Sequence, residues 1–551
     1  HGLKTVLEAN QIVEGHAMCA FFGVLFQLEP DEGKSFTSLF GTVKSLSVIR
    51  EARHRILNTQ FIDQQLSEAR AIARDLTDKV DTVSGSREFN GYCRQTFLDN
   101  LIRGGYPIRL GERHIYHVYS RKHGDIERDY NYFVLPPTYY SQGNGNYRDI
   151  NQNRRNDVFF VPQAGEFNIR LFMSLIQADG YNPLVINGLS FSLPSDQVSE
   201  LLALASQPKG LAQVLKEPFS PGKLFDAAVN ANLSLSAEDF LHLVISKSDV
   251  VIHADHGEGF WIDHWTYNLD LIDAYLAVFP DRRQDLLFYS KPLPFSDNPH
   301  IVQPRKNRYV LHHHQPRQSN AVIEDPEKAA LINSREAGGQ WARSDHGSGE
   351  VFRLSLISKL ALLALIKFAT RDPWGMGIQM EAGKPGWYDA LNGLPGLFGS
   401  SMPEAYELLR LVNFLRDAFK DFSHELHLPV EAQILLDALE TVPDFVLGSL
   451  DYWEHLTSAL ERYRESIRLG FDGRTIEIDP TALFKVMVQH LEAGFSRSQS
   501  FNDKLPPTYF KYHVTDYSVR ETTDLVGNPY IVVKGFTPEP LPPFLEGTAR
   551  L

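Results

Sequence analysis

Apolar residues recur at helical spacing along most of this chain, and this periodicity constrains its fold more than any other feature. Strand patterns are sparse by comparison, and long connections rich in Gly, Tyr, Trp, Asn, Asp and His separate the helical segments. Connections of this length in a compact domain are usually functional. Helical segments are expected at about 89–103, 166–180, 194–206, 235–247, 264–279, 349–370, 402–424, 429–441, 450–468 and 480–495.

The pattern predicts a mainly α fold, and helices that carry decorated loops on one rim fit an (α/α)6 toroid barrel. A helical bundle or an α-solenoid would show the same periodicity, although the chain has no self-similar motif of solenoid length. The toroid is therefore our expectation, and the other helical layouts stay open.

Two further patterns precede these helices. Apolar runs between Ala17 and Val43 flank the turn signal Pro30–Gly33, which is typical of a hairpin at the end of a β domain. Helical periodicity with many polar residues follows from about Val48 and suits an interdomain connector. We expect an N-terminal remnant at 1–47, a helical linker at 48–83 and a helical domain at 84–551 that is truncated at its C-terminus.

Composition excludes several classes of protein. The 551 residues are 43% hydrophobic and 22% charged, which is typical of a globular protein. A net charge of -14 disfavours nucleic acid as a partner, because phosphate backbones are bound by clustered Lys and Arg. Since Cys19 and Cys93 are the two cysteines, the chain can build neither a disulfide framework nor a cysteine zinc site. We expect a cytoplasmic protein.

The most apolar stretch, from Val351 to Phe368, contains Arg353, Lys359 and Lys367. A cation at the centre of a bilayer costs ~2.5–3.5 kcal/mol on insertion scales. The stretch therefore predicts a buried helix, and we expect no membrane partner.

The segment from Glu381 to Gly393 places Lys384, Trp387, Tyr388 and Asp389 in a loop rich in glycine. Sugars stack their C–H faces on flat rings, while their hydroxyl groups hydrogen bond to carboxylates, amides and arginine. The segment predicts a carbohydrate site, although a turn with buried aromatic rings would look similar.

Two other segments carry the same chemistry. Residues 142–157 are dense in hydrogen-bonding side chains, and Arg148, Asp149 and Gln152 would suit a polyol clamp or an exposed polar loop. Residues 256–267 place Glu258, Asp263 and Trp265 among further aromatic rings. Asp263 also suits the N-cap of the helix that follows.

Ser400 and Ser401 precede another predicted helix, and they lack the strand-to-helix elbow of a serine hydrolase. Glu404 stands at the capping-box position after them. We therefore expect a helix cap here and assign it no catalytic role.

In chain order, the three polar segments resemble the catalytic module of the cellobiose/chitobiose phosphorylase family, the inverting phosphorylases related to glycoside hydrolase family 94. Tyr147–Gln152 is similar to the family's arginine-aspartate-x-x-glutamine loop, which holds the sugar of the −1 subsite. Trp387-Tyr388-Asp389 is similar to its tryptophan-asparagine-aspartate loop, and the resemblance implies that Asp389 is the general acid. The resemblance covers about residues 17–425. It implies that residues 1–47 are the last part of an N-terminal β-sandwich domain.

The chain departs from the family pattern at two positions of the third segment. Gly386 stands where the family has an aspartate, and Tyr388 stands where it has an asparagine. Beyond about residue 430 we find no match, and the family carries its phosphate-binding loop in that part of the barrel.

The resemblance implies inverting phosphorolysis of a β-linked gluco-oligosaccharide to a sugar 1-phosphate. Inorganic phosphate would be a co-substrate, with no metal and no organic cofactor. An inverting hydrolase or transglycosylase is the alternative, with Glu258, Asp263 or Glu381 as the second carboxylate. A non-catalytic carbohydrate-binding domain is a further alternative, and a homodimer is one option for the oligomeric state. The expected substrate-binding residues are Arg148, Asp149, Gln152, Asp263, Trp265, Lys384, Trp387 and Tyr388.

Overall fold

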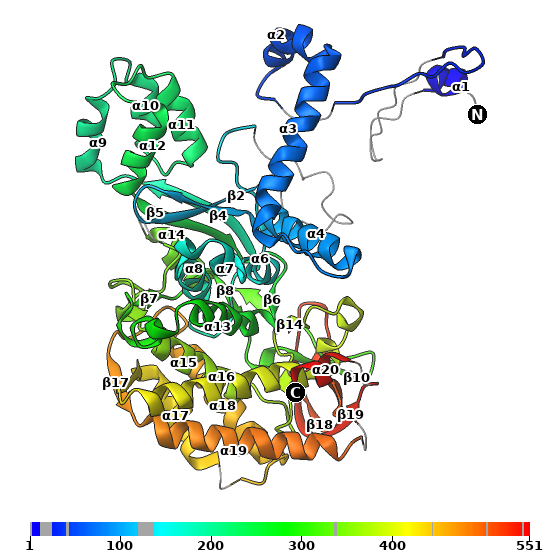
Figure 1. The fold of residues 1–551 in the computed structure, drawn as a ribbon. Coiled ribbons are helices and arrows are strands. Elements are labelled where there is room, and N and C mark those ends of the chain that lie inside the picture. The colour runs from blue at the N-terminus through cyan, green and yellow to red at the C-terminus, as the bar shows by residue number, and fades with distance from the viewer. Residues whose placement is uncertain are drawn as a thin grey trace.

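The fold combines many helices with several small sheets (Figure 1). The computed structural model describes residues 3–10, 25–39, 43–119, 137–335, 339–442, 445–502, 505–542 and 545–551. The expectation of a helix-rich chain is confirmed. The expectation that strands are sparse is wrong, because a six-stranded sheet and a three-stranded sheet are present.

The N-terminal part is largely helical, and α2 and α3 extend away from the rest of the molecule (Figure 1). Of the predicted hairpin, residues 17–24 and 40–42 lie outside the described residues, and residues 25–39 contain a turn at Asp31 but no strand. The predicted linker forms two helices, because the first ends at its C-cap Leu57 and Asn58 caps the next. The helices here are α1 (Leu3–Glu8), α2 (Leu46–Ile56), α3 (Thr59–Thr77) and α4 (Arg87–Gly104).

A three-stranded antiparallel sheet, in the order β3-β4-β5, forms the next layer. Its strands are β3 (Gly145–Asn146), β4 (Val185–Ser192) and β5 (Asp249–Asp255). Four helices are inserted between β4 and β5 and group at one end of the molecule (Figure 1), namely α9 (Ser195–Leu202), α10 (Lys209–Val214), α11 (Pro221–Val229) and α12 (Ala237–Ser246). On the other side of this sheet lie α6 (Tyr147–Arg154), α7 (Asp157–Phe160), α8 (Phe167–Leu175) and α13 (Asn268–Val278).

The main core surrounds α15 (Leu356–Ala369), in which every residue is buried. Lys359 donates to the carbonyl oxygen of Pro294, and Lys367 lies 4.3 Å from the centre of the Tyr181 ring. Both buried cations therefore have partners, as the buried-helix prediction requires. Helix α15 packs against α16 (Met402–Asp421), α17 (Gln433–Thr441) and α18 (Leu450–Ser466), and α19 (Pro480–Gln499) packs on α16 and α17.

None of the helices in the described ranges combines the length and the apolar character that crossing a bilayer requires. The predicted helix 349–370 begins late, at Leu356, because Arg353–Leu354 pairs with Leu293–Pro294 and Ser355 caps the helix. The predicted helix 166–180 ends early, at Leu175.

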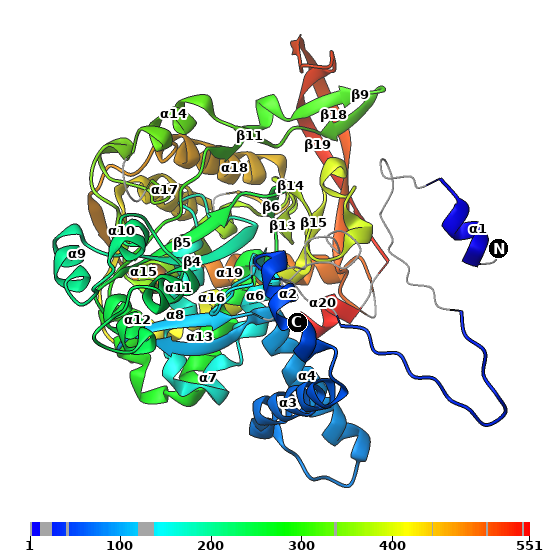
Figure 2. The same cartoon turned by 90° about the horizontal axis from the view of Figure 1, so that it is seen from above.

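The six-stranded sheet has the order β10-β9-β19-β18-β15-β13, and its short strands are β9 (Tyr309–His312), β10 (Gln315–Gln318), β13 (Ile378–Gln379) and β15 (Ser400–Ser401). Its long strands β18 (Tyr509–Thr523) and β19 (Pro529–Pro540) form a hairpin that projects from the body with β9 (Figure 2). Residues 509–523 are rich in Tyr, Val and Thr, and Gly527 occupies the turn with a φ of 89°. This composition, followed by a glycine turn, is typical of a β-hairpin, and the prediction of a mainly helical chain did not include it.

The remaining elements are short. They are β1 (Tyr106–Leu110), β2 (His114–Val118), β6 (Phe260–Trp261), β7 (Leu293–Pro294), β8 (His300–Val302), β11 (Val322–Glu324), α14 (Pro326–Ser334), β12 (Arg353–Leu354), β14 (Gly383–Lys384), β16 (Leu426–Pro429), β17 (Thr475–Ile478) and α20 (Leu545–Arg550).

Candidate functional site

Two of the three polar segments run side by side. Strand β14 pairs in parallel with β6, so that Gly383 lies opposite Phe260 and Lys384 opposite Trp261. The backbone N–H of Ile262 then donates to the carbonyl oxygen of Pro385 at 3.2 Å. The loop that carries Trp387 and Asp389 is thus fixed beside the segment that carries Asp263.

The third segment joins them through α6. The Tyr147 hydroxyl hydrogen bonds to Asn268 Oδ1 at 2.9 Å, and the Tyr147 ring stacks on His264 with centroids 5.8 Å apart. On the next residue, Arg148 Nη1 lies 3.6 Å from Asp263 Oδ2. Arg148 Nε donates to Asp149 Oδ1 at 2.9 Å. All three sequence-predicted segments therefore meet around Asp263.

Asp263 lies at the centre of this arrangement and is 1% exposed. It precedes the short helix η4 (His264–Tyr267), yet its side chain forms no cap hydrogen bond with the described residues. The Tyr267 hydroxyl instead donates to Asp263 Oδ2 at 3.2 Å. Burial raises the pKa of Asp263, and the Arg148 charge opposes that rise. The Asp263 carboxylate therefore interacts with Arg148 and Tyr267 and does not form the N-cap hydrogen bond that its position also allowed.

Glu404, on α16, is a member of the site that the sequence interpretation missed. It is 3% exposed, and burial with nearby Asp263 and Glu546 raises its pKa to about 8. The predicted cap position is confirmed, because Ser401 is the N-cap residue of α16, but its side chain forms no capping hydrogen bond with the described residues. The sequence carried a signal, since Glu404 stands among the apolar residues Met402, Pro403, Ala405 and Tyr406, which the structure shows to be buried, and a buried glutamate is rare without a partner.

Gly386 brings the loop against both acids. A Cβ atom built on Gly386 would lie 3.6 Å from Glu404 Oε1 and 3.7 Å from Asp263 Cγ. No atom of the described residues is nearer to it than 3.6 Å, apart from its chain neighbours. The missing side chain therefore leaves space beside the two carboxyl groups.

Helix α20 closes the site from a distant part of the chain. Glu546 Oε1 accepts a hydrogen bond from the Trp387 indole at 2.7 Å, and Glu546 Oε2 accepts one from the Tyr509 hydroxyl at 2.8 Å. Arg550 Nη1 pairs with Glu407 Oε1 at 3.0 Å, and its guanidinium lies 5.7 Å from the centre of the Tyr267 ring. These contacts fix the Trp387 ring at the edge of the site.

The predicted general acid and the rings before it lie on the open rim. Trp387 is 44% and Tyr388 38% exposed, and Asp389 is exposed at the start of a short helix. Both rings therefore present faces on which a sugar can stack. Trp265, by contrast, is buried and forms part of the wall.

The remaining predicted residues lie further out or behind the site. Lys384 Nζ lies 5.8 Å from the centre of the Trp261 ring. The side chains of Gln152 and Glu258 are exposed.

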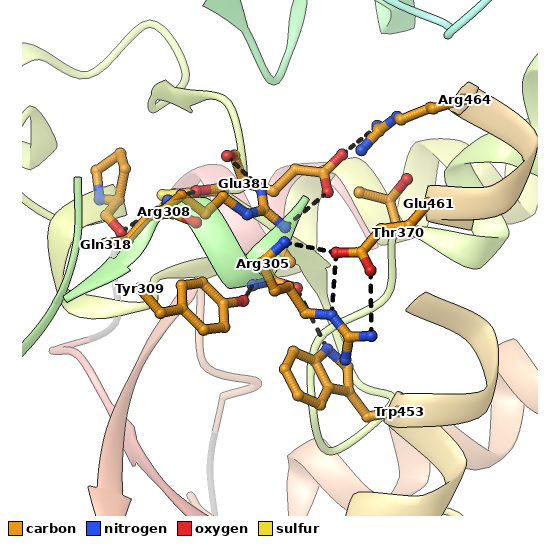
Figure 3. A network of polar contacts seen from close by, with 12 residues as sticks. Arg305, Arg308, Tyr309, Gln318, Thr370, Glu381, Trp453, Glu461 and Arg464 are labelled. Atoms are coloured by element: carbon orange, nitrogen blue, oxygen red, sulfur yellow. Dashed lines mark hydrogen bonds and ion pairs between the residues drawn. The ribbon is translucent and has the colours of Figure 1, made fainter. Parts of the chain in front are cut away.

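Glu381 belongs to a separate network behind the loop, which Figure 3 shows. Its carboxylate accepts hydrogen bonds from Arg464 and from the Tyr181 hydroxyl, and Arg308 Nη2 lies 3.5 Å from Oε2. Burial acts to raise the pKa of Glu381, but the charge of Arg464 and its hydrogen bond outweigh burial and lower that pKa to about 2. This arrangement suits a buried counter-ion better than a general base.

Within the described residues, no group of three or more His, Cys, Asp or Glu side chains is placed to hold a metal ion. A comparison with protein-family models finds no matching family, and a comparison with curated proteins finds no significant match. The resemblance described above therefore rests on the residues of the three segments.

Proposed function

We propose that this chain is a carbohydrate-active enzyme that cleaves a β-linked gluco-oligosaccharide by inverting phosphorolysis. The proposal rests on one observation, which is that three segments distant in sequence meet around Asp263. Each of these segments carries side chains that suit sugars. Their meeting places an arginine, buried acids and exposed aromatic rings within one site, which is the composition that sugar recognition requires.

In this mechanism Asp389 protonates the oxygen of the leaving sugar, while inorganic phosphate attacks the anomeric carbon from the opposite face. Arg148 and Asp149 would hold the sugar whose bond is broken. Trp387 and Tyr388 would support it by stacking, and the exposure of both rings is consistent with this role. The assignment of Asp389 rests on the resemblance.

An inverting hydrolase is the second candidate, and the buried acid pair favours it. In such an enzyme one carboxylate activates water at a distance of about 6.5–9.5 Å from the acid. Asp263 and Glu404 are two buried carboxyl groups next to the loop that carries Asp389. Asp263 is the better base, because Arg148 and Tyr267 stabilise its charge.

The finer architecture is also a proposal. We propose that the helices around α15 belong to an (α/α)6 toroid, and the packing of α15 on α16, α17 and α18, with α19 on α16 and α17, supports this arrangement.

The function is tested with the purified chain and a panel of β-linked gluco-oligosaccharides, with and without inorganic phosphate. We expect phosphate-dependent release of a sugar 1-phosphate, and a loss of at least about 100-fold in Asp389→Asn, since general acid catalysis contributes about 10²–10⁴-fold. Asp417→Asn on α16, whose side chain is 53% exposed, is the matched control.

Release of free sugar regardless of phosphate would replace phosphorolysis by hydrolysis. Asp263→Asn would then be the next variant to assay. Release of neither product from any member of the panel would overturn both candidate functions.

A further inference from the structure

Two buried carboxyl oxygens at the site lack the partners that buried polar atoms normally have. Asp263 Oδ1 and Glu404 Oε2 form no hydrogen bond with any residue that the structure describes. Leaving a buried polar atom unpaired destabilises the fold, and more so when the atom is charged. Such atoms in a folded protein call for an explanation, and a missing ligand is one.

The space next to these acids is open because residue 386 is a glycine. The built Cβ of Gly386 has ordinary contact distances of 3.6 Å or more to the described residues around it, so a methyl group fits there without strain. In the natural chain that volume is free beside both carboxyl groups. A ligand atom at the Cβ position contacts Glu404 Oε1 and the Asp263 side chain, next to the two unpaired oxygens of the same carboxyl groups.

We infer that Asp263, Glu404 and the backbone of Gly386 together bind one hydroxyl group of a neutral sugar. This inference rests on the proposed function and adds to it a residue, Glu404, and a specificity contact. A hydroxyl group both donates and accepts a hydrogen bond. Ionised Asp263 can accept from it, and protonated Glu404 can donate to it. An anionic ligand group is disfavoured, because Asp263 and Glu546 already bring negative charge.

The surroundings of Glu404 favour its protonated form at neutral pH. Burial and the charges of Asp263 and Glu546 raise its pKa to about 8, and Arg550 acts in the opposite direction. Asp263 keeps its charge more easily, because it has Arg148 and the Tyr267 hydroxyl as partners. The groups that face Glu404 from neighbouring elements are Asp263 before η4, Glu546 and Arg550 on α20, Tyr509 on β18 and Lys367 on α15.

The test is calorimetric titration of the chain with cellobiose at pH 6.5 and pH 9.5. We expect the Kd of the natural chain to rise roughly tenfold at the higher pH, because Glu404 loses the proton that it donates. Glu404→Gln keeps a neutral donor, so its Kd should be the same at both values. If Lys367 were the titrating group, Glu404→Gln would keep the pH dependence, and the inference would fail.

Gly386→Ala fills the space and should weaken binding at least tenfold at both pH values. Gly393→Ala in the same loop is its control, because the Cβ position of Gly393 has no described neighbour within 4 Å. Asp417→Asn controls for the loss of a carboxyl group on α16. Unchanged binding in Gly386→Ala, an equal Kd of the natural chain at both pH values, or no binding of cellobiose would each overturn the inference.

Turnover is measured separately on the same variants, so that failure of the proposed enzyme activity can be distinguished from failure of the hydroxyl site. Binding with the expected pH and variant pattern but without bond cleavage would reject the proposed enzyme and keep the hydroxyl site. Cleavage that is indifferent to Gly386→Ala and Glu404→Gln would reject the hydroxyl site and keep the enzyme.

Discussion

At the residue scale, two buried glutamates have opposite protonation states. Glu381 and Glu404 are 1% and 3% exposed, so burial acts on both to raise the pKa. Glu381 has Arg464 and Arg308 as partners, and its pKa falls to about 2. Glu404 has acids as neighbours, and its pKa rises to about 8. The sign of the shift is decided by the partner charge, which no local sequence pattern specifies.

The Glu381 network predicts a large loss of stability in Glu381→Gln. The substitution leaves the buried guanidinium groups of Arg308 and Arg464 without their counter-ion, which costs about 3–5 kcal/mol. Urea denaturation at pH 7 measures it, with Glu477→Gln on the exposed face of β17 as the control. A loss below ~1 kcal/mol would show that the arginines find other partners.

At the scale of elements, α20 adds a further carboxylate to the site, that of Glu546. Glu546 holds the Trp387 indole, and its charge is one cause of the raised pKa of Glu404. Helix α20 contributes both effects although it lies more than 100 residues away along the chain from Glu404 and Trp387.

We predict that Glu546→Gln lowers the pKa of Glu404. The amide oxygen can still accept from Trp387, but the negative charge is gone, so the pH at which cellobiose binding weakens should fall by about one pH unit. A series of Kd values between pH 6 and pH 10 measures the midpoint. Glu440→Gln, on the exposed side of α17, should leave it unchanged. An unmoved midpoint in Glu546→Gln would exclude Glu546 as a cause of the shift.

At the scale of the whole molecule, two buried and two half-buried histidines make the fold sensitive to acid. Burial lowers the pKa of His117 to about 4 and that of His264 to about 3, and partial burial lowers the pKa of His256 and His490 to about 4. The unfolded chain binds these protons from about pH 6.5 downwards, so acid favours unfolding. Glu404 acts in the opposite sense, because its raised pKa makes the fold less stable as pH rises from about 4.5 to 8.

We therefore predict that the free energy of unfolding falls by about 2–3 kcal/mol between pH 7 and pH 5, because His117 and His264, with a smaller contribution from the solvent-screened His256 and His490, outweigh Glu404. Urea denaturation at both pH values measures the difference. His117→Gln should reduce the drop, and His427→Gln, which replaces an exposed ring on β16, should not. Equal stability at pH 7 and pH 5 would contradict the prediction. Below about pH 4.5 the protonation of Glu381 adds a further loss.

The sequence by itself determined most helices and the chemical character of the site. Helices such as α16 and α18 were predicted closely, because their periodicity and boundary residues act over a few residues. Likewise the three polar segments were found from composition alone, and the structure places them together.

Only the tertiary structure decided which of these side chains form ion pairs and hydrogen bonds with one another. Whether Asp263 caps a helix or pairs with Arg148 depends on a residue more than 100 positions away. The same holds for Glu404, whose neighbours come from η4, α15, β18 and α20, and for the pairing of β18 with β15 in the large sheet. Local patterns encode helices, because their hydrogen bonds span four residues, whereas burial and ion pairing depend on contacts between distant segments.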